Sequence, residues 1–168
     1  MIESDTIKLL RECDAGIKMG IAGIDDTLEY VDHEPFRKAL MDCRNKHEKL
    51  KEEIQGLLEK YHDKGKEPTP MAKGMSWIKT NVKLVFNESD STIAELLTDG
   101  CNMGIKSLNQ YLNQYQAADE KTKDIAKKLI SQEKKLVNIC RKKESVIKKS
   151  QTLFFIEAGF LSASLLSA

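Results

Sequence analysis

The sequence contains little glycine, little proline and few aromatic residues. Its 168 residues include 9 Gly, 3 Pro, 5 Phe, 4 Tyr and 1 Trp. Sandwiches and barrels need many Gly- and Pro-rich turns, and phosphate-binding loops need clustered glycines. The scarcity argues against those folds, and the chain has no P-loop, GxGxxG or GxSxG motif. No segment alternates apolar and polar residues convincingly, so no strands are expected.

The cysteines are few and widely separated. They are Cys13, Cys43, Cys101 and Cys140. No CxxC pair occurs, which argues against a zinc knuckle or a thioredoxin-like motif. The first ten residues are mixed in charge, which predicts no targeting peptide. A chain of this length can bury a sizeable core without disulfides. We therefore expect reduced, buried thiols in a cytoplasmic protein.

The apolar residues recur at alternating spacings of three and four, which is typical of amphipathic helices. This pattern predicts four long helices, over residues 4–32, 35–64, about 91–116 and 119–150. A short amphipathic helix over residues 71–86 is expected to connect the second and third. Asp32 is the expected cap of the second helix, and Gly65 is its expected stop signal.

The two halves of the sequence resemble each other. The segment Cys13–Lys18 matches Cys101–Lys106, and each copy opens a pair of helices. Two helical hairpins predict an all-α four-helix bundle with one long crossover, over residues 1–150. Acids dominate residues 1–34 and bases dominate residues 121–149, which favours the first and fourth helices as neighbours.

The last segment, residues 151–168, differs in composition from the rest. From Leu153 onward it is apolar, with Glu157 as its one charge. It is shorter than the ~20 residues needed to span a bilayer. We expect a separate apolar C-terminal helix that packs on the bundle or on a second subunit, with membrane contact as the alternative.

Three segments carry a resemblance to a known family. They are LLRECDAGIKMG in the first helix, the connector over residues 75–86 with Trp77, and ELLTDGCNMGIKSLNQYL in the third helix. The pattern resembles the ferritin-like four-helix-bundle superfamily, and most closely a small bacterial ferritin-like family of unknown function. The resemblance covers about residues 5–146 and implies a ferritin-like bundle with a crossover.

The resemblance does not extend to the di-metal centre of that superfamily. Such centres take one Glu from each of two helices and a Glu-x-x-His from each of the other two. The predicted fourth helix has no histidine, and Arg44 stands three residues before His47. Lys18 and Lys106 stand where relatives carry acids. We therefore expect no bound metal, no cofactor and no oxidase activity.

If a site exists, its candidate residues are Asp14, Cys43 and His47. Asp14 and His47 are polar residues on apolar stripes, and Cys43 precedes His47 by one helical turn. The histidine could activate the thiol or share a soft metal with it. The simpler interpretation is a histidine hydrogen-bonded to Asp14 or Asn102, and an Asp14 that pairs with His47 or a lysine.

These observations favour a non-catalytic binding or structural protein that forms a homo-oligomer. Two alternatives are consistent with the same sequence. One is a divergent metal-binding or thiol-redox protein that uses Asp14, Cys43 and His47. The other is a membrane-associated protein that uses the basic fourth helix and the apolar tail. Nucleic-acid binding is not expected, because the basic helix offers no aromatic side chain for base stacking.

Overall fold

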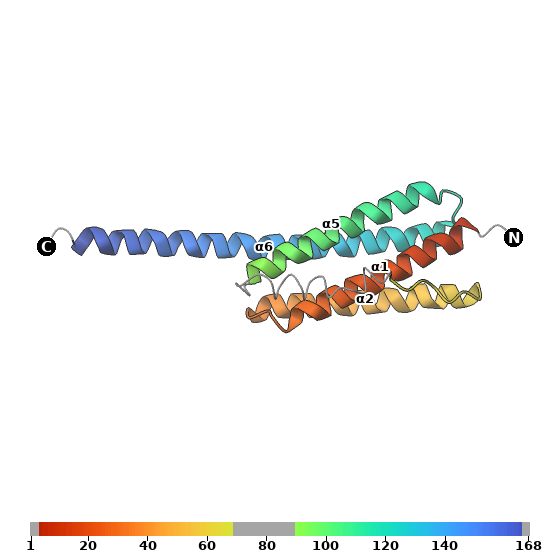
Figure 1. Cartoon of the computed structure of the whole chain (residues 1–168), viewed down its shortest axis with the longest axis horizontal. Helices are drawn as coiled ribbons and strands as arrows, with labels where there is room; N and C mark the ends of the chain where they lie inside the picture. Colours follow the sequence, from red (N-terminus) through yellow and green to blue (C-terminus); the bar gives the residue numbers. More distant parts are fainter. Residues whose placement is uncertain (1–3, 69–89, 166–168) are drawn as a thin grey trace.

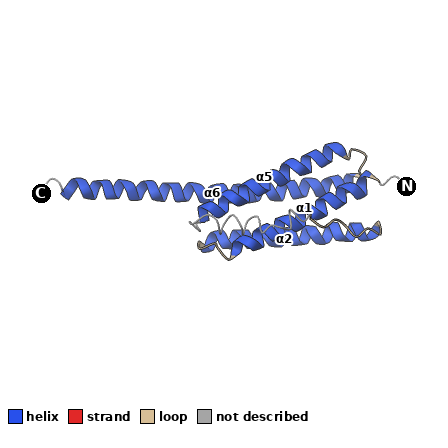
Figure 2. Ribbon diagram, in the orientation of Figure 1, coloured by secondary structure: helices blue, strands red, loops and turns tan. Residues whose placement is uncertain are grey.

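The described part of the chain forms a bundle of four long helices (Figures 1 and 2). The computed structural model describes residues 4–68 and 90–165, with side chains of the last helix described up to Lys143 and at Ser145. The helices are α1 (Asp5–Leu28), α2 (Glu34–Lys60), α5 (Asp90–Gln114) and α6 (Glu120–Leu165). No strand occurs in the described ranges, so the all-α prediction is confirmed.

The first two helices have features that are typical of helix termini, but two of their terminal residues differ from the predictions. Ser4 caps α1, because its hydroxyl accepts a hydrogen bond from the N–H of Ile7. The residue that caps α2 is His33, not Asp32, and Pro35 lies in the first turn as expected. The helix ends at Lys60, before the predicted boundary, so Gly65 lies in the following connection.

The helix directions require a long connection in the middle of the chain. Helices α1 and α2 are antiparallel, α5 and α6 are antiparallel, and α2 and α5 run in the same direction (Figure 1). The described part of the connection, residues 61–68, returns along α1 through contacts from Asp63 to Arg11 and from Glu67 to Lys18. The helix predicted over residues 71–86 lies outside the described residues.

The core consists of two apolar clusters, one toward each end of the bundle. The first cluster includes Leu9, Leu10, Ile17, Ile54 and Leu129. The second includes Ile24, Leu40, Ile93, Leu136 and Cys140. In α2 and α6, the buried positions between these clusters are taken by His47 and Glu133. A polar layer therefore separates the two halves of the core.

The fourth helix is longer than the sequence analysis predicted. Helix α6 has 46 residues and continues without a break to Leu165, so residues 151–165 extend it instead of forming a separate helix. Its C-terminal part extends past the ends of the other three helices (Figure 1). None of the described helices has both the length and the apolar content needed to cross a bilayer.

Ion pairs link α6 to α2 and to α5. Among the described residues, Lys128 of α6 pairs with Glu53 of α2 at 3.0 Å, and Lys143 pairs with Asp90 of α5 at 2.9 Å. The carboxylate of Asp90 also accepts hydrogen bonds from the backbone N–H groups of Asp32 and His33. Asp90 thus ties the α1–α2 loop to α5 and α6.

Candidate functional site

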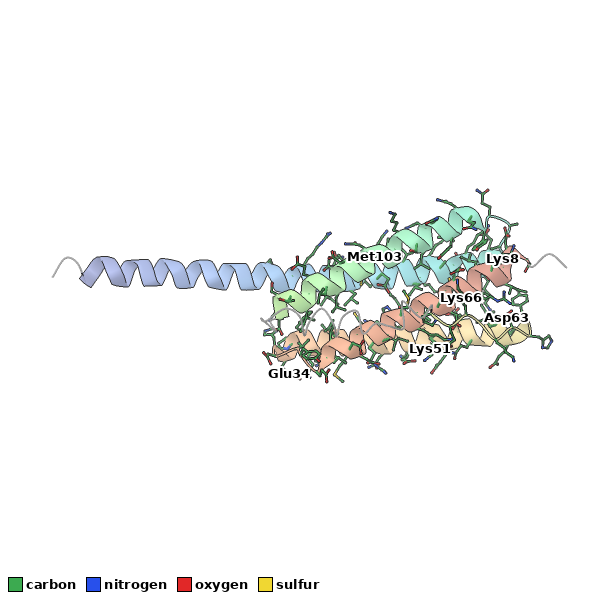
Figure 3. The ribbon with its side chains drawn as sticks, viewed as in Figure 1. Lys8, Glu34, Lys51, Asp63, Lys66 and Met103 are labelled. Atoms are coloured by element: carbon green, nitrogen blue, oxygen red, sulfur yellow. The ribbon has the colours of Figure 1, made fainter. Side chains whose placement is uncertain are left out.

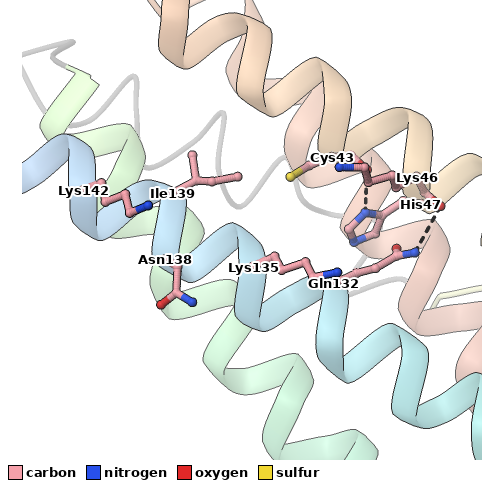
Figure 4. Close-up of a pocket in the computed structure, with 8 residues that line it drawn as sticks. All are labelled: Cys43, Lys46, His47, Gln132, Lys135, Asn138, Ile139 and Lys142. Atoms are coloured by element: carbon pink, nitrogen blue, oxygen red, sulfur yellow. Dashed lines mark hydrogen bonds between the residues drawn. The ribbon is translucent and has the colours of Figure 1, made fainter.

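A buried histidine–glutamate pair occupies the polar layer between the two core clusters. His47 of α2 is fully buried, and its Nδ1 lies 2.8 Å from the carbonyl oxygen of Cys43 (Figure 4). Its Nε2 lies 3.1 Å from Oε1 of Glu133 on α6, and Glu133 is 7% exposed. The pair is the polar contact that joins α2 to α6 inside the bundle.

The geometry of the pair determines how many protons it holds. A carbonyl oxygen can only accept, so Nδ1 of His47 carries a proton and donates it to Cys43. The contact between Nε2 and Glu133 then needs one more proton, held by the imidazole or by the carboxyl group. In either form both buried groups have a hydrogen-bond partner, which removes the main cost of burying them.

A glycine on α1 makes room for this pair. A Cβ atom at Gly20 would lie 3.2 Å from Oε1 of Glu133 and 3.2 Å from Cδ2 of His47. Such contacts are tighter than ordinary van der Waals contacts, so a methyl group at this position would require the pair to shift by a few tenths of an ångström. Gly20 thus provides space that the side chains of His47 and Glu133 occupy.

The cysteines near the pair are held as thiols. Burial is the main cause that raises the pKa of Cys43 and of Cys101, and Glu133 raises both further. The negative charge of Glu133 is the largest contribution to the raised pKa of Cys101 after burial. In α1, burial raises the pKa of Cys13 to about 12, with added contributions from Glu12 and Asp14. All four cysteines are buried and free, and the protonated form is a poor nucleophile.

Asp14 belongs to a different part of the bundle. Its Oδ2 accepts hydrogen bonds from Nζ of Lys18 at 2.8 Å and from the backbone N–H of Lys66 at 3.0 Å. Its Oδ1 is buried without a hydrogen-bond partner among the described residues. The partner is therefore a lysine and not His47, and the neighbouring residue is Gly65 of the connection.

The connection after α2 is fastened to α1 by several charged contacts around Asp14. Arg11 forms two hydrogen bonds with Asp63, at 3.0 and 2.7 Å. Nζ of Lys66 donates to Glu12 at 2.7 Å. Asp63 and Lys66 lie beside the beginning of α1 (Figure 3). Asp14 therefore serves to anchor the connection, which gives this buried carboxylate a structural role.

The structure brings Cys43 and His47 together and places Asp14 elsewhere. Asn102, the other predicted partner of His47, is exposed. Within the described ranges, no three His, Cys, Asp or Glu side chains are arranged to hold a metal ion. The described side chains therefore do not assemble the ligand set of the di-metal centre that the resemblance implies. The partner that sequence reasoning missed is Glu133.

A cavity of about 310 Å³ lies between α2 and α6, next to the buried pair (Figure 4). Cys43 and His47 of α2 face α6 across it. The residues that line it are Cys43, Lys46, His47, Gln132, Lys135, Asn138, Ile139 and Lys142. Gln132 donates from its amide nitrogen to the carbonyl of Lys46 at 3.3 Å, while its amide oxygen is buried without a partner among the described residues.

Comparison of the chain with family models, with curated proteins and with solved structures finds no match.

Proposed function

We propose that the protein is a non-catalytic, ferritin-like helical bundle that self-associates through the C-terminal part of α6. The observation that carries this proposal is the unbroken course of α6 to Leu165, past the ends of the other helices (Figure 1). A helix that leaves its own bundle cannot bury its surface against it. It needs another partner if its sequence is apolar.

The sequence of this part of α6 is apolar on all sides of the helix. The run Leu153, Phe154, Phe155 and Ile156 places large side chains at four consecutive positions, which no single face can hold. A helix of this kind is typical of a buried environment. Each large apolar side chain contributes about 1.5–3 kcal/mol when fully buried. Leaving the segment in water would therefore be costly.

A second copy of the chain is the partner that fits best. A twofold interface lets two such segments cover each other, because each copy supplies the same surface. The lipid alternative draws support from Lys148 and Lys149 just before the segment. It is weakened by Glu157 and by the finding that no described helix meets the requirements for a membrane span.

The ferritin-like part of the proposal rests on helix direction and on the resemblance of the sequence. Two antiparallel hairpins joined so that α2 and α5 run in the same direction need one long crossover, as ferritin-like bundles do (Figure 1). The thiol-redox alternative has less support, because Cys43 is the one cysteine that lines the cavity and burial keeps it protonated. A binding or structural role is what remains.

The test removes residues 151–168 and measures the molar mass by light scattering without detergent. We expect the full chain to be a dimer or a larger oligomer and the shortened chain to have a lower molar mass. A point variant, Phe155→Asp, should act in the same direction. Its matched control is Ser145→Asp, which adds the same charge to an exposed position of the same helix.

Two outcomes would reject the proposal. The first is a full-length chain that is monomeric at concentrations of tens of micromolar. The second is an oligomer whose mass is unchanged by the deletion. If the monomeric chain instead sediments with vesicles that contain anionic lipid, the membrane-associated alternative replaces self-association.

A further inference from the structure

The lining of the cavity between α2 and α6 carries positive charge without a compensating acid. The whole sequence is nearly balanced, with 27 bases and 26 acids. The eight residues that line the cavity include Lys46, Lys135 and Lys142 and no Asp or Glu. None of these lysines forms an ion pair with another described residue. Three exposed lysines thus line one hollow, and no described acid pairs with them directly.

The other groups in the cavity do not oppose an anion. Cys43 is kept as the neutral thiol, since burial raises its pKa. Glu133 does not line the cavity, and its Oε1 already contacts Nε2 of His47. Both ring nitrogens of His47 already have partners, so the imidazole forms part of the wall and has no nitrogen left for a ligand.

The lining residues also carry polar groups that have no partner among the described residues and can bind a ligand. The three ammonium groups and the amide of Asn138 can donate hydrogen bonds, while the unpartnered amide oxygen of Gln132 can accept one. Ile139 and the lysine stems provide apolar contact beside them. The volume of about 310 Å³ is at the small end of the range for ligand sites.

We propose that this cavity binds a small phosphomonoester, with the phosphate held by Lys46, Lys135 and Lys142 and the organic part lying against Ile139. A dianionic phosphate has enough acceptor oxygens for three lysines, which bind phosphate as point charges. The hydroxyl groups of the organic part can donate to Gln132. This site is independent of self-association through α6, and it adds a ligand to a protein otherwise assigned only a structural role.

The test is isothermal titration calorimetry on the full chain at low ionic strength and pH 7.5, with inorganic phosphate and phenyl phosphate as the probes. We expect both probes to bind and phenyl phosphate to bind more tightly, because its ring adds apolar contact. Lys135→Gln and Lys142→Gln should each weaken binding about tenfold, which corresponds to the loss of one charge-assisted contact.

The matched controls are Lys134→Gln and Lys49→Gln. Like the cavity lysines, both are exposed and lie on α2 or α6, but neither lines the cavity. We expect less than about a twofold change for them, because a charge outside the lining acts on the ligand only through solvent. Circular dichroism and light scattering would verify that each variant keeps its helices and its oligomeric mass.

Three results would overturn the proposal. One is the absence of heat from either probe at millimolar concentration. Another is an equal loss of affinity in the control variants, which would show a general effect of net charge. The third is tighter binding of citrate than of phenyl phosphate, which would reject the phosphomonoester as the ligand.

Discussion

At the scale of single residues, Gly65 and Asp14 fit each other closely. Gly65 has φ +74, a conformation that side-chain-bearing residues rarely adopt, and a Cβ there would lie 2.2 Å from Oδ2 of Asp14. The absence of a side chain lets the connection reach the carboxylate, so that the N–H of Lys66 can donate to it. Glycine is required at this position because the backbone has a positive φ and because a side chain would collide with Asp14.

We expect Gly65→Ala to destabilise the protein by about 1–3 kcal/mol, because it adds backbone strain and displaces the Asp14 carboxylate. Thermal or urea unfolding followed by circular dichroism measures the change. Gly56→Ala is the control, since nothing lies within 4 Å of a Cβ there and the residue is inside α2. It should stabilise the chain by up to about 1 kcal/mol. An equal effect of both substitutions would contradict the assigned role of Gly65.

The partner of His47 was the residue that the sequence analysis did not find. Glu133 lies between Lys134 and Gln132, so its local sequence looks like a solvated helix face. The signal that could have revealed it is a gap in the apolar stripe of the fourth helix, between Leu129 and Leu136. A buried stripe continues through such a gap, so a polar residue there must be buried with it.

At the scale of helices, the His47–Glu133 contact couples α2 to α6. Each side chain is the hydrogen-bond partner of the other, in an interior where a polar group without a partner costs stability. The contact specifies the register of the two helices, since sliding either one by a turn would leave both groups without a partner. An apolar pair would fill the same space without fixing that register.

We expect His47→Leu to destabilise the protein by about 3–5 kcal/mol, because it leaves the Glu133 carboxyl buried without its histidine. Glu133→Leu should cost less, about 1–3 kcal/mol, since a neutral imidazole is cheaper to leave unpaired. The double variant His47→Leu with Glu133→Leu should be more stable than His47→Leu alone. Urea unfolding of the four proteins gives the coupling energy. If the losses in the free energy of unfolding of the two single variants add up to the loss in the double variant, the two side chains do not interact.

The existence and approximate position of the helices followed from the sequence, while the end of α6 did not. The periodic apolar residues were sufficient to locate α1, α2, α5 and the bundle part of α6. The predicted break near residue 150 relied on a change in composition. Helices stop at Gly, Pro or a cap, and no Gly or Pro occurs between Glu120 and Ala158. The change in composition marks where the surroundings of the helix change, not where it ends.

At the scale of the whole molecule, each connection between helices depends on an aspartate. Asp90 holds the α1–α2 loop, Asp63 fastens the connection after α2, and Asp119 caps α6 through the N–H of Thr122. The Arg11 hydrogen bond lowers the pKa of Asp63. Burial would raise the pKa of Asp90 and Asp119, but contacts from Lys143 and from Thr122 respectively outweigh it, so both values lie below 3.8.

Because these pKa values are lowered in the folded state, we expect the protein to lose stability in acid. A lowered pKa contributes stability that is present above the unfolded value of 3.8 and is lost as the pH falls through the folded value. Urea midpoints measured from pH 6 to pH 2 should decrease most steeply below about pH 4.

A variant at one connection isolates this effect. Asp90→Asn should be less stable at pH 6 and should show a shallower decrease in acid, because one of the titrating groups is gone. The control is Asp99→Asn, at an exposed position of the same helix. Stability that stays constant from pH 6 to pH 2 would contradict the assigned role of the three aspartates.

The length of α6 gives the molecule a mechanical property. At a rise of 1.5 Å per residue, its 46 residues measure about 70 Å, and the 24 residues of α1 measure about 36 Å. Because the helix is continuous, a change of tilt in the part that packs in the bundle also moves the part that extends beyond it. A small change in the tilt of α6 where it packs on α2, beside the cavity, would therefore displace the backbone at Leu165 by a larger distance than it displaces the packed part. A partner bound to that end of α6 would be displaced when the packing of α6 in the bundle changes.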